Sequence, residues 1–328
     1  MKTSVAILQY IKERKEASAK EITDFLDISS RAVFKQLAKL TQERVLTKIG
    51  KPPKVFYKLI EETPEIREST DNAAVYFTDE QERIIAENFL YITPLGEYFE
   101  GINAFIKWCH DRSLNPLQQA DQYKKIVEGI NKSRKNGLIS AKSKIKSEFG
   151  KSYLKEVYYL DFYAIPQFGK TKLGQLLLYA KQSQDKARIR MISEIAKPRI
   201  QSILQAHRVN AVAFIPPTVK REIQFIKELE RNLNISLPMI KVSKVKTPII
   251  VPQKTLNKLE DRVLNARNTL VVDDQRVFKR VLLIDDAVGS GATLNETAKK
   301  LIESKQAKEV YGLAITGSYK GFDVISEV

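Results

Sequence analysis

"VLLIDDAVGSGATL", residues 281–294, decides the expected fold of the C-terminal half of this 328-residue chain. Residues 281–284 are apolar and have the length of a short buried strand, with Asp285 and Asp286 at its carboxyl end. A glycine-containing turn at residues 289–293 follows and leads into a helix that begins near Leu294. The stretch therefore predicts a strand, a turn and a helix that meet at one edge of a sheet.

The turn and the two acids predict a ligand with two chemically different ends. Backbone N–H groups at a glycine turn before a helix point toward one place, and the helix dipole adds positive potential there, so this end favours a phosphate. Asp285 and Asp286 would repel that phosphate, so we expect them to face sugar hydroxyls or a magnesium ion with its waters. A ribose 5-phosphate satisfies both ends. The G-x-x-x-x-G-K-[ST] order of a nucleotide P-loop is absent.

Short apolar runs alternate with helical patterns over residues 158–328. We expect helices at 219–233 and 292–304, and strands at 209–217, 239–245, 279–288 and 308–318. This alternation predicts an α/β fold with a mostly parallel sheet and flanking helices, in which ligands bind at the carboxyl ends of the strands.

Residues 281–294 resemble the phosphoribosyl pyrophosphate (PRPP) signature of type I phosphoribosyltransferases. The resemblance implies that Asp285 and Asp286 hold the ribose hydroxyls, act as the catalytic acids and contact Mg²⁺, while residues 289–293 wrap the 5-phosphate. The implied PRPP-binding residues are Asp285, Asp286, Ala287, Val288, Gly289, Ser290, Gly291, Ala292 and Thr293.

Two further segments are similar to the ComF-like branch of this family. They are residues 168–200 and residues 251–272, where Gln253, Leu256, Arg262 and Asn265 are loose counterparts of that branch's pattern. The resemblance thus covers residues 158–328. ComF-like proteins are linked to DNA uptake and often carry a cysteine-rich zinc module in front. This chain has a single cysteine, Cys109, so that module is missing.

Several positions depart from the family pattern or permit two interpretations. Gly289 stands where many base-salvage relatives carry an aspartate as general base. The arginine-rich loop after the first core strand is reduced to "IPPTVKREIQF", residues 215–225. Its candidate pyrophosphate-binding residues are Pro217, Thr218, Lys220 and Arg221, although the last two also fit solvated charges at a helix start.

Two more sets of residues fit either a ligand-binding role or a structural role. Lys241, Lys244 and Lys246 lie where the family's mobile loop begins. They either cover the pyrophosphate or are exposed side chains without a ligand-binding role. Tyr319 and Phe322 either stack on a base or close the last layer of the sheet.

The first sixty residues predict three helices followed by a hairpin. The helical patterns are residues 5–14, 18–28 and 29–46, and the second begins with a Ser18–Glu21 capping box. In the third, Val33, Leu37 and Leu40 form an inward stripe. The hairpin at residues 45–60 turns through Gly-Lys-Pro-Pro-Lys. The whole stretch resembles a winged helix-turn-helix domain.

The charge of this N-terminal stretch favours DNA as its partner. Residues 1–60 contain 13 Lys and Arg against 6 Asp and Glu. The third helix of a winged helix domain enters the major groove, so Ser30 and Arg31 are candidates for base edges and the lysines for phosphates. The candidate DNA-binding residues are Ser30, Arg31, Lys35, Lys39, Lys48, Lys51 and Lys54. The alternative is a winged helix that serves protein–protein contact or dimerisation.

The predicted organisation has three parts: residues 1–62, a linker and helical region at 63–157, and residues 158–328. In the middle part, residues 124–157 are expected to be helical, and their basic run from 132 to 155 is either a nucleic-acid surface or a solvated face. Cys109, His110 and His207 have no partner spacing for metal or nucleophilic chemistry, so we expect structural roles for them.

The bulk composition agrees with a polyanionic partner. The formal charge of +16 favours nucleic acid or phosphorylated ligands. No apolar run approaches the roughly 20 residues of a membrane span, and the N-terminus lacks the pattern of a signal peptide, so we expect a cytoplasmic protein.

Three functions fit these patterns. The first is a DNA-binding phosphoribosyltransferase that transfers ribose 5-phosphate and releases pyrophosphate. The second is a transcriptional regulator whose transferase fold senses PRPP or a nucleotide, which Gly289 and the reduced loop favour. The third is a nucleic-acid-targeting effector. A homodimer is a candidate assembly, because a DNA site with two half-sites is bound by two DNA-binding domains. The acceptor base, the DNA sequence and the regulated genes are not specified by the sequence.

Overall fold

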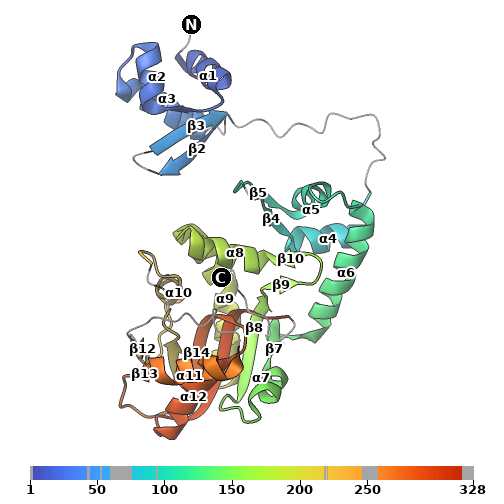
Figure 1. Ribbon diagram of the computed structural model, residues 1–328, viewed down its shortest axis with the longest axis vertical. Coiled ribbons are helices and arrows are strands. Elements are labelled where there is room, and N and C mark those ends of the chain that lie inside the picture. The colour runs from blue at the N-terminus through green and yellow to red at the C-terminus, as the bar shows by residue number, and fades with distance from the viewer. Residues whose placement is uncertain are drawn as a thin grey trace. The chain divides into compact units, whose positions relative to one another are not determined.

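The chain consists of two compact units, residues 1–74 and residues 75–328 (Figure 1). The computed structural model describes residues 3–42, 45–51, 54–59, 76–93, 95–217, 219, 221–245 and 258–319.

The N-terminal unit has the predicted order of helices and hairpin. Its elements are α1 (Thr3–Arg14), β1 (Ala17–Ser18), α2 (Ala19–Leu26), α3 (Ser30–Gln42), β2 (Leu46–Lys51) and β3 (Lys54–Leu59). The strands form an antiparallel sheet in the order β1-β3-β2. The Ser18–Glu21 capping box is present at the start of α2. Val33, Leu37 and Leu40 lie in the core of this unit, as the inward stripe predicted.

A six-stranded sheet organises the C-terminal unit and confirms the predicted α/β class. Its order is β11 (Ala211–Phe214), β14 (Phe278–Val288), β15 (Ala307–Gly317), β8 (Glu156–Phe162), β7 (Leu138–Ser140) and β6 (Arg134–Lys135). The first four strands run parallel, and the last two pair antiparallel. The predicted strand at 239–245 is divided: Met239 forms a parallel bridge with Val212 of β11, whereas β12 (Val242–Lys244) pairs with β13 (Leu270–Val272) outside this sheet.

Helices cover both faces of the sheet. Val281 and Leu283 of β14 pack into one core cluster, whereas Leu282 and Ile284 pack into the other. The first cluster contains residues of α12 (Ala292–Glu303), and the second contains residues of α8 (Lys172–Gln182), α9 (Lys186–Ala206) and α10 (Phe225–Leu233). Figure 1 shows α12 and α9 on opposite sides of the strands. A strand that is buried on both faces explains why residues 281–284 are all apolar.

The middle region packs into the core of the sheet instead of standing apart from it. It contains α4 (Asp79–Asn88), β4 (Leu90–Ile92), β5 (Tyr98–Glu100), α5 (Gly101–His110), α6 (Pro116–Ser133) and α7 (Lys142–Phe149). Side chains from α4, α5 and α6 share one core cluster with β8, β14 and β15. Cys109 is fully buried there, in line with the expected structural role. The predicted boundary between residues 157 and 158 falls within β8.

Residues 124–157, which the sequence predicts to be helical, are helical only in part. Residues 134–140 form the hairpin of β6 and β7 between α6 and α7. Asn136 and Gly137 both have positive φ, 53° and 74°, the conformation that a two-residue hairpin turn requires. The Asn-Gly pair is the sequence signal for this turn, and it lies within a lysine-rich stretch.

The remaining described elements are β9 (Ala164–Ile165), β10 (Gly169–Lys170) and α11 (Leu259–Thr269). His207 caps the C-terminus of α9, where its ring stacks on Tyr311 and Tyr158 contributes a hydroxyl 2.9 Å from Nε2. This agrees with the structural role expected for His207. Among the described residues, every helix is too short or too polar to cross a membrane.

Two helical glycines are expected to respond oppositely to substitution by alanine. A Cβ on Gly174 in α8 would lie 2.0 Å from the carbonyl oxygen of Tyr163, whereas a Cβ on Gly129 in α6 would meet nothing within 4 Å. Gly174→Ala should therefore lower the free energy of unfolding by about 1–3 kcal/mol, because the backbone must shift. Gly129→Ala should raise it by about 0.5–1 kcal/mol through helix propensity.

Urea denaturation followed by the fluorescence of Trp108 measures both changes. Trp108 is the single tryptophan of the chain and lies in the core of this unit. A stabilising effect of Gly174→Ala would contradict the close approach of α8 to Tyr163.

Candidate functional site

The acid pair lies at the carboxyl end of β14, with the glycine turn directly after it. β14 continues to Val288, so Asp285 and Asp286 are still part of the strand, and Asp285 is in register with Ala314 of β15. α12 begins at Ala292, two residues before the expected start near Leu294. Thr293 therefore belongs to the first helical turn. The three features that the sequence predicted to meet are adjacent in the structure.

The turn between β14 and α12 is largely buried, and several of its backbone donors lack an intramolecular partner among the described residues. Gly291 is the N-cap of α12 with φ 81°, and it supplies no side-chain cap. Within the described part of the chain, the amides of Gly289, Ser290 and Gly291 donate no hydrogen bond. The Ser290 hydroxyl accepts one from the Ala292 amide at 3.3 Å. Uncapped amides at a helix N-terminus favour an anion.

The positive φ of Gly291 favours glycine there, and the missing Cβ also leaves room for a neighbouring side chain. A Cβ there would lie 2.9 Å from Cδ1 of Ile145, because α7 packs against the turn. The middle region thus closes one side of the turn.

Asp285 is almost fully buried at the end of its strand. Its Oδ1 accepts a hydrogen bond of 2.8 Å from the Asp286 amide. Burial, reinforced by the neighbouring charge of Asp286, raises the pKa of Asp285 to about 8, while the positive charges of Lys181 and Lys244 oppose this rise.

Asp286 forms an ion pair that sequence analysis did not anticipate. Its Oδ2 lies 2.9 Å from Nζ of Lys181, and the two side chains are 18 % and 15 % exposed. Lys181 belongs to the last turn of α8, 105 residues away in the chain. No spacing rule links residues at that separation, so only the packing of α8 on the sheet could identify this partner.

The segment predicted to bind pyrophosphate lies next to Lys181. Arg221 donates a hydrogen bond of 2.7 Å from Nη1 to the backbone carbonyl of Lys181, and it lies four residues before α10 begins at Phe225. It is therefore not a solvated charge at a helix start. Pro217 is half-buried, whereas Thr218 and Lys220 lie outside the described residues.

The three lysines of the predicted mobile loop have different surroundings. Lys241 is exposed and forms an ion pair of 3.2 Å with Asp273. Lys244 of β12 is partly buried; desolvation lowers its pKa, and the charge of Asp285 opposes this effect. Lys246 lies outside the described residues. Of the two lysines that the structure describes here, Lys244 is the one associated with the acid pair.

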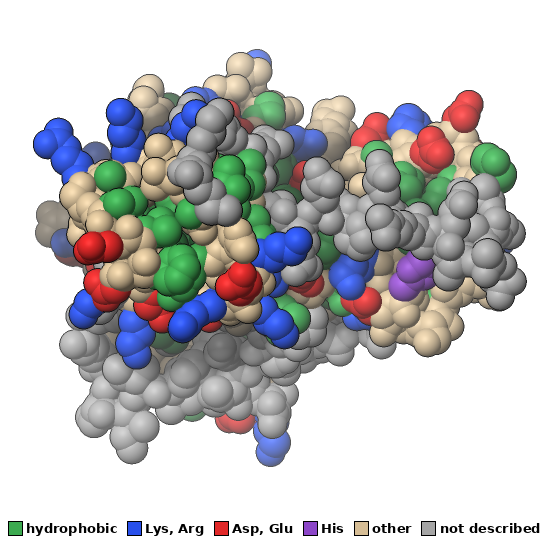
Figure 2. Space-filling view, turned by 90° about the horizontal axis from the view of Figure 1, so that it is seen from above, with side chains coloured by type: hydrophobic (Ala, Val, Ile, Leu, Met, Phe, Trp, Pro, Cys, Tyr) green, Lys and Arg blue, Asp and Glu red, His purple; other side chains and the backbone are tan. Residues whose placement is uncertain are grey.

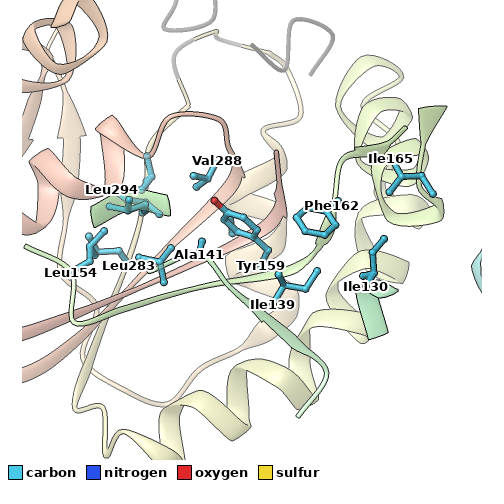
Figure 3. Close-up of a cluster of buried hydrophobic side chains, with 14 of the residues drawn as sticks. Ile130, Ile139, Ala141, Leu154, Tyr159, Phe162, Ile165, Leu283, Val288 and Leu294 are labelled. Atoms are coloured by element: carbon cyan, nitrogen blue, oxygen red, sulfur yellow. The ribbon is translucent and has the colours of Figure 1, made fainter. Parts of the chain in front are cut away.

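Tyr159 of β8 is a further neighbour of the turn that sequence analysis missed. Figure 3 shows its ring next to Ile139 and its hydroxyl directed toward Val288. A Cβ on Gly317 would lie 2.1 Å from this ring, so glycine is required there for the tyrosine to lie against β15. Burial raises the pKa of Tyr159, which keeps the phenol protonated and able to donate.

The structure describes three of the other aromatic and ComF-like candidates, Tyr319, Arg262 and Asn265. Tyr319 is 39 % exposed and packs edge-on against Phe162, with ring centroids 4.9 Å apart. Arg262 is buried in α11, which also carries Asn265. Gln253, Leu256 and Phe322 lie outside the described residues.

The acid pair by itself is a sparse donor set for a cation. Over the described part of the chain, no three His, Cys, Asp or Glu side chains are grouped in a way that could hold a metal. Mg²⁺ commonly takes one or two carboxylates and completes its shell with water and substrate phosphate oxygens. The two carboxylates fit that arrangement only together with a phosphorylated ligand.

The candidate DNA-binding side chains are exposed where the structure describes them. Ser30, Arg31, Lys35 and Lys39 are exposed on α3, and Lys48 and Lys54 on the β2–β3 hairpin. Lys51 pairs with Lys54 in the strand register, and its side chain lies outside the described part. Phe34, also on α3, is 54 % exposed, an apolar group that sequence analysis left out. On the face drawn in Figure 2, basic side chains are scattered among acidic and hydrophobic ones.

Comparison with known proteins identifies the N-terminal unit. Residues 2–62 match the family model of the winged helix DNA-binding domain. A search of curated proteins found no match.

Among solved structures, the chain is similar to hypoxanthine phosphoribosyltransferases. With the enzyme of Staphylococcus aureus it shares 13 % identity at a TM-score of 0.26, covering 42 % of this chain and 66 % of that one. With the Trypanosoma cruzi enzyme the identity is 13 % and the TM-score 0.28, covering 42 % and 68 %.

The stability of the C-terminal unit should depend on the protonation of Asp285. A carboxyl group whose pKa is raised to about 8 holds a proton that the unfolded chain releases near pH ~4. Stability should therefore fall as pH rises through this window, by at most ~1.4 kcal/mol per pH unit. Asp285→Asn should remove this dependence and stabilise the unit at pH 8.5.

Urea denaturation at pH 5.5 and pH 8.5, followed by Trp108 fluorescence, measures the effect. The control Asp273→Asn removes an exposed carboxyl group and should keep the pH dependence of the unsubstituted protein. If the stability of the Asp285→Asn variant has the same pH dependence as that of the unsubstituted protein, the buried carboxyl group does not cause this dependence.

Proposed function

We propose that the C-terminal unit binds PRPP, and that the chain is a ComF-like phosphoribosyltransferase fused to a DNA-binding winged helix domain. One observation carries the proposal: two carboxylates lie near the carboxyl end of a buried parallel strand, and an uncapped glycine turn at a helix N-terminus follows within three residues. Few ligands need both groups side by side. A pentose with a phosphate ester at one end does.

In this proposal the two parts of the site bind opposite ends of the sugar. Asp285 and Asp286 accept hydrogen bonds from the ribose hydroxyls. The amides of Gly289, Ser290 and Gly291, together with the hydroxyls of Ser290 and Thr293, donate to the 5-phosphate. Pro217, Thr218, Lys220 and Arg221 bind the pyrophosphate. Bound Mg²⁺ would neutralise charge on the departing pyrophosphate, and its contacts on this chain would be Asp285 and Asp286.

The proposed reaction exchanges one bond at the anomeric carbon of the ribose. The bond to the pyrophosphate oxygen breaks, a bond to a nitrogen nucleophile forms, and the nucleophile loses a proton. Gly289 has no side chain to accept that proton. This observation favours the second candidate function, a transcriptional regulator in which PRPP or a nucleotide binds without turnover.

Pyrophosphate release separates the two candidates. The full chain is incubated with labelled PRPP, magnesium, and a panel of nucleobases and DNA duplexes. Release that requires one acceptor indicates a transferase, whereas saturable binding without release indicates a sensor.

For the N-terminal unit, we propose binding to duplex DNA with α3 in the major groove. The match to the winged helix DNA-binding family and the exposed basic side chains of α3 and the hairpin support this. Ser30 and Arg31 would contact base edges, while Lys35, Lys39, Lys48, Lys51 and Lys54 would contact phosphates.

Replacing both acids should abolish ligand binding. Asp285→Asn with Asp286→Asn keeps the shape of the site and removes the charged acceptors for the ribose hydroxyls, so PRPP affinity should fall by at least about 100-fold, on the order of 3 kcal/mol. Isothermal titration calorimetry of PRPP in magnesium measures the loss, and the urea midpoint checks the fold. Unchanged affinity would reject the assignment of the acids.

Removing two lysines of the hairpin should weaken DNA binding without a sequence preference. Lys48→Ala with Lys54→Ala should lower duplex affinity and reduce the slope of log K against log salt by about 2, since each phosphate contact contributes about 0.9. Fluorescence anisotropy across a salt series measures both. Lys279→Ala with Lys305→Ala, two exposed lysines of the other unit, is the matched control. If the unsubstituted protein has no duplex affinity at low salt, the winged helix does not bind DNA.

A further inference from the structure

Lys181 connects the acid pair with the segment that follows the neighbouring strand. Its ammonium group contacts Asp286 at 2.9 Å, and its backbone carbonyl accepts the hydrogen bond from Arg221 at 2.7 Å. The last turn of α8 therefore contacts both the carboxyl-terminal part of β14 and the segment that follows β11.

The position of this turn is fixed from several sides. The apolar side chains of α8, among them Leu176 and Leu177, pack in the core cluster on that face of the sheet. Beyond the helix end, Gln184 accepts a hydrogen bond of 2.7 Å from the Ile223 amide. β11 and β14 are adjacent parallel strands, and the Ile215 amide donates to the Ile284 carbonyl at 2.9 Å. Lys181 thus lies beside the junction where the two strands end.

Two adjacent carboxylates disfavour a polyanion, and a positive charge beside them reduces this repulsion. Lys181 supplies that charge, since its side chain is only 15 % exposed and is aligned by its ion pair rather than by solvent. An ammonium group has three N–H donors, so the bond to Asp286 leaves donors for a second partner. The ligand group that we expect to bind near Arg221 is the pyrophosphate.

We infer that Lys181 is a further ligand-binding residue, which contacts the pyrophosphate group of PRPP while its ion pair holds Asp286 for the ribose. The inference rests on the proposed function and deepens it. It predicts that the site distinguishes an activated sugar from one without pyrophosphate. PRPP should gain affinity from Lys181, whereas ribose 5-phosphate, which has no group at that end, should gain little.

Two ligands and three variants test this inference. PRPP and ribose 5-phosphate are titrated by calorimetry, in magnesium, into the full chain and its Lys181→Met, Lys181→Arg and Lys172→Met variants. Lys181→Met should weaken PRPP at least about 10-fold, the usual cost of removing one charged contact to a phosphate, and should weaken ribose 5-phosphate less than about 3-fold. Lys181→Arg keeps the charge and should retain most of the affinity for PRPP.

Lys172→Met is the matched control, because Lys172 begins the same helix and pairs with Glu100 at 3.3 Å. It should leave both affinities unchanged. The urea midpoint from Trp108 fluorescence checks folding, and if Lys181→Met does not fold, Lys181→Gln takes its place.

The outcomes separate the inference from the proposed function. Selective loss of PRPP supports a contact between Lys181 and the pyrophosphate. Equal loss of both ligands would mean that Lys181 only positions Asp286, and no loss of either would mean that it takes no part in binding. Both of these results overturn the inference but leave PRPP binding intact. Failure of the unsubstituted chain to bind either ligand rejects the proposed function itself.

Discussion

The placement of two carboxylates side by side at the end of a buried strand is the constraint on which the C-terminal unit depends. Two neighbouring negative charges repel each other, and burial penalises each of them further. The structure offsets this cost with Lys181 against Asp286 at 2.9 Å and with the positive charge of Lys244, while burial raises the pKa of Asp285.

The remaining walls of the site depend on close approaches that only glycine permits. Gly291 lets α7 pack against the turn, and Gly317 lets the ring of Tyr159 lie against β15 with its hydroxyl toward Val288. Both contacts come from the middle region or from the strand that follows it. The middle region is therefore part of the scaffold of the site, and it shares one hydrophobic core with the sheet.

The winged helix domain has a separate core, built from residues such as Ile11, Ile22 and Leu37. Among the described residues, no core cluster contains residues of both units, so each unit is stabilised by its own core.

Local patterns in the sequence determined the elements and the chemistry of the turn. The apolar run at 281–284, the two acids and the glycines specify a buried strand, a charged end and an uncapped helix start, since each depends on residues close together in the chain. The capping box of Ser18 and the inward stripe of α3 are local in the same way. Tertiary structure alone decided the pairing of Lys181 with Asp286, the approach of Tyr159 to Gly317 and the joining of β6 and β7 to the sheet. These contacts link segments far apart in sequence, and they follow from how helices and strands pack, which no local spacing encodes.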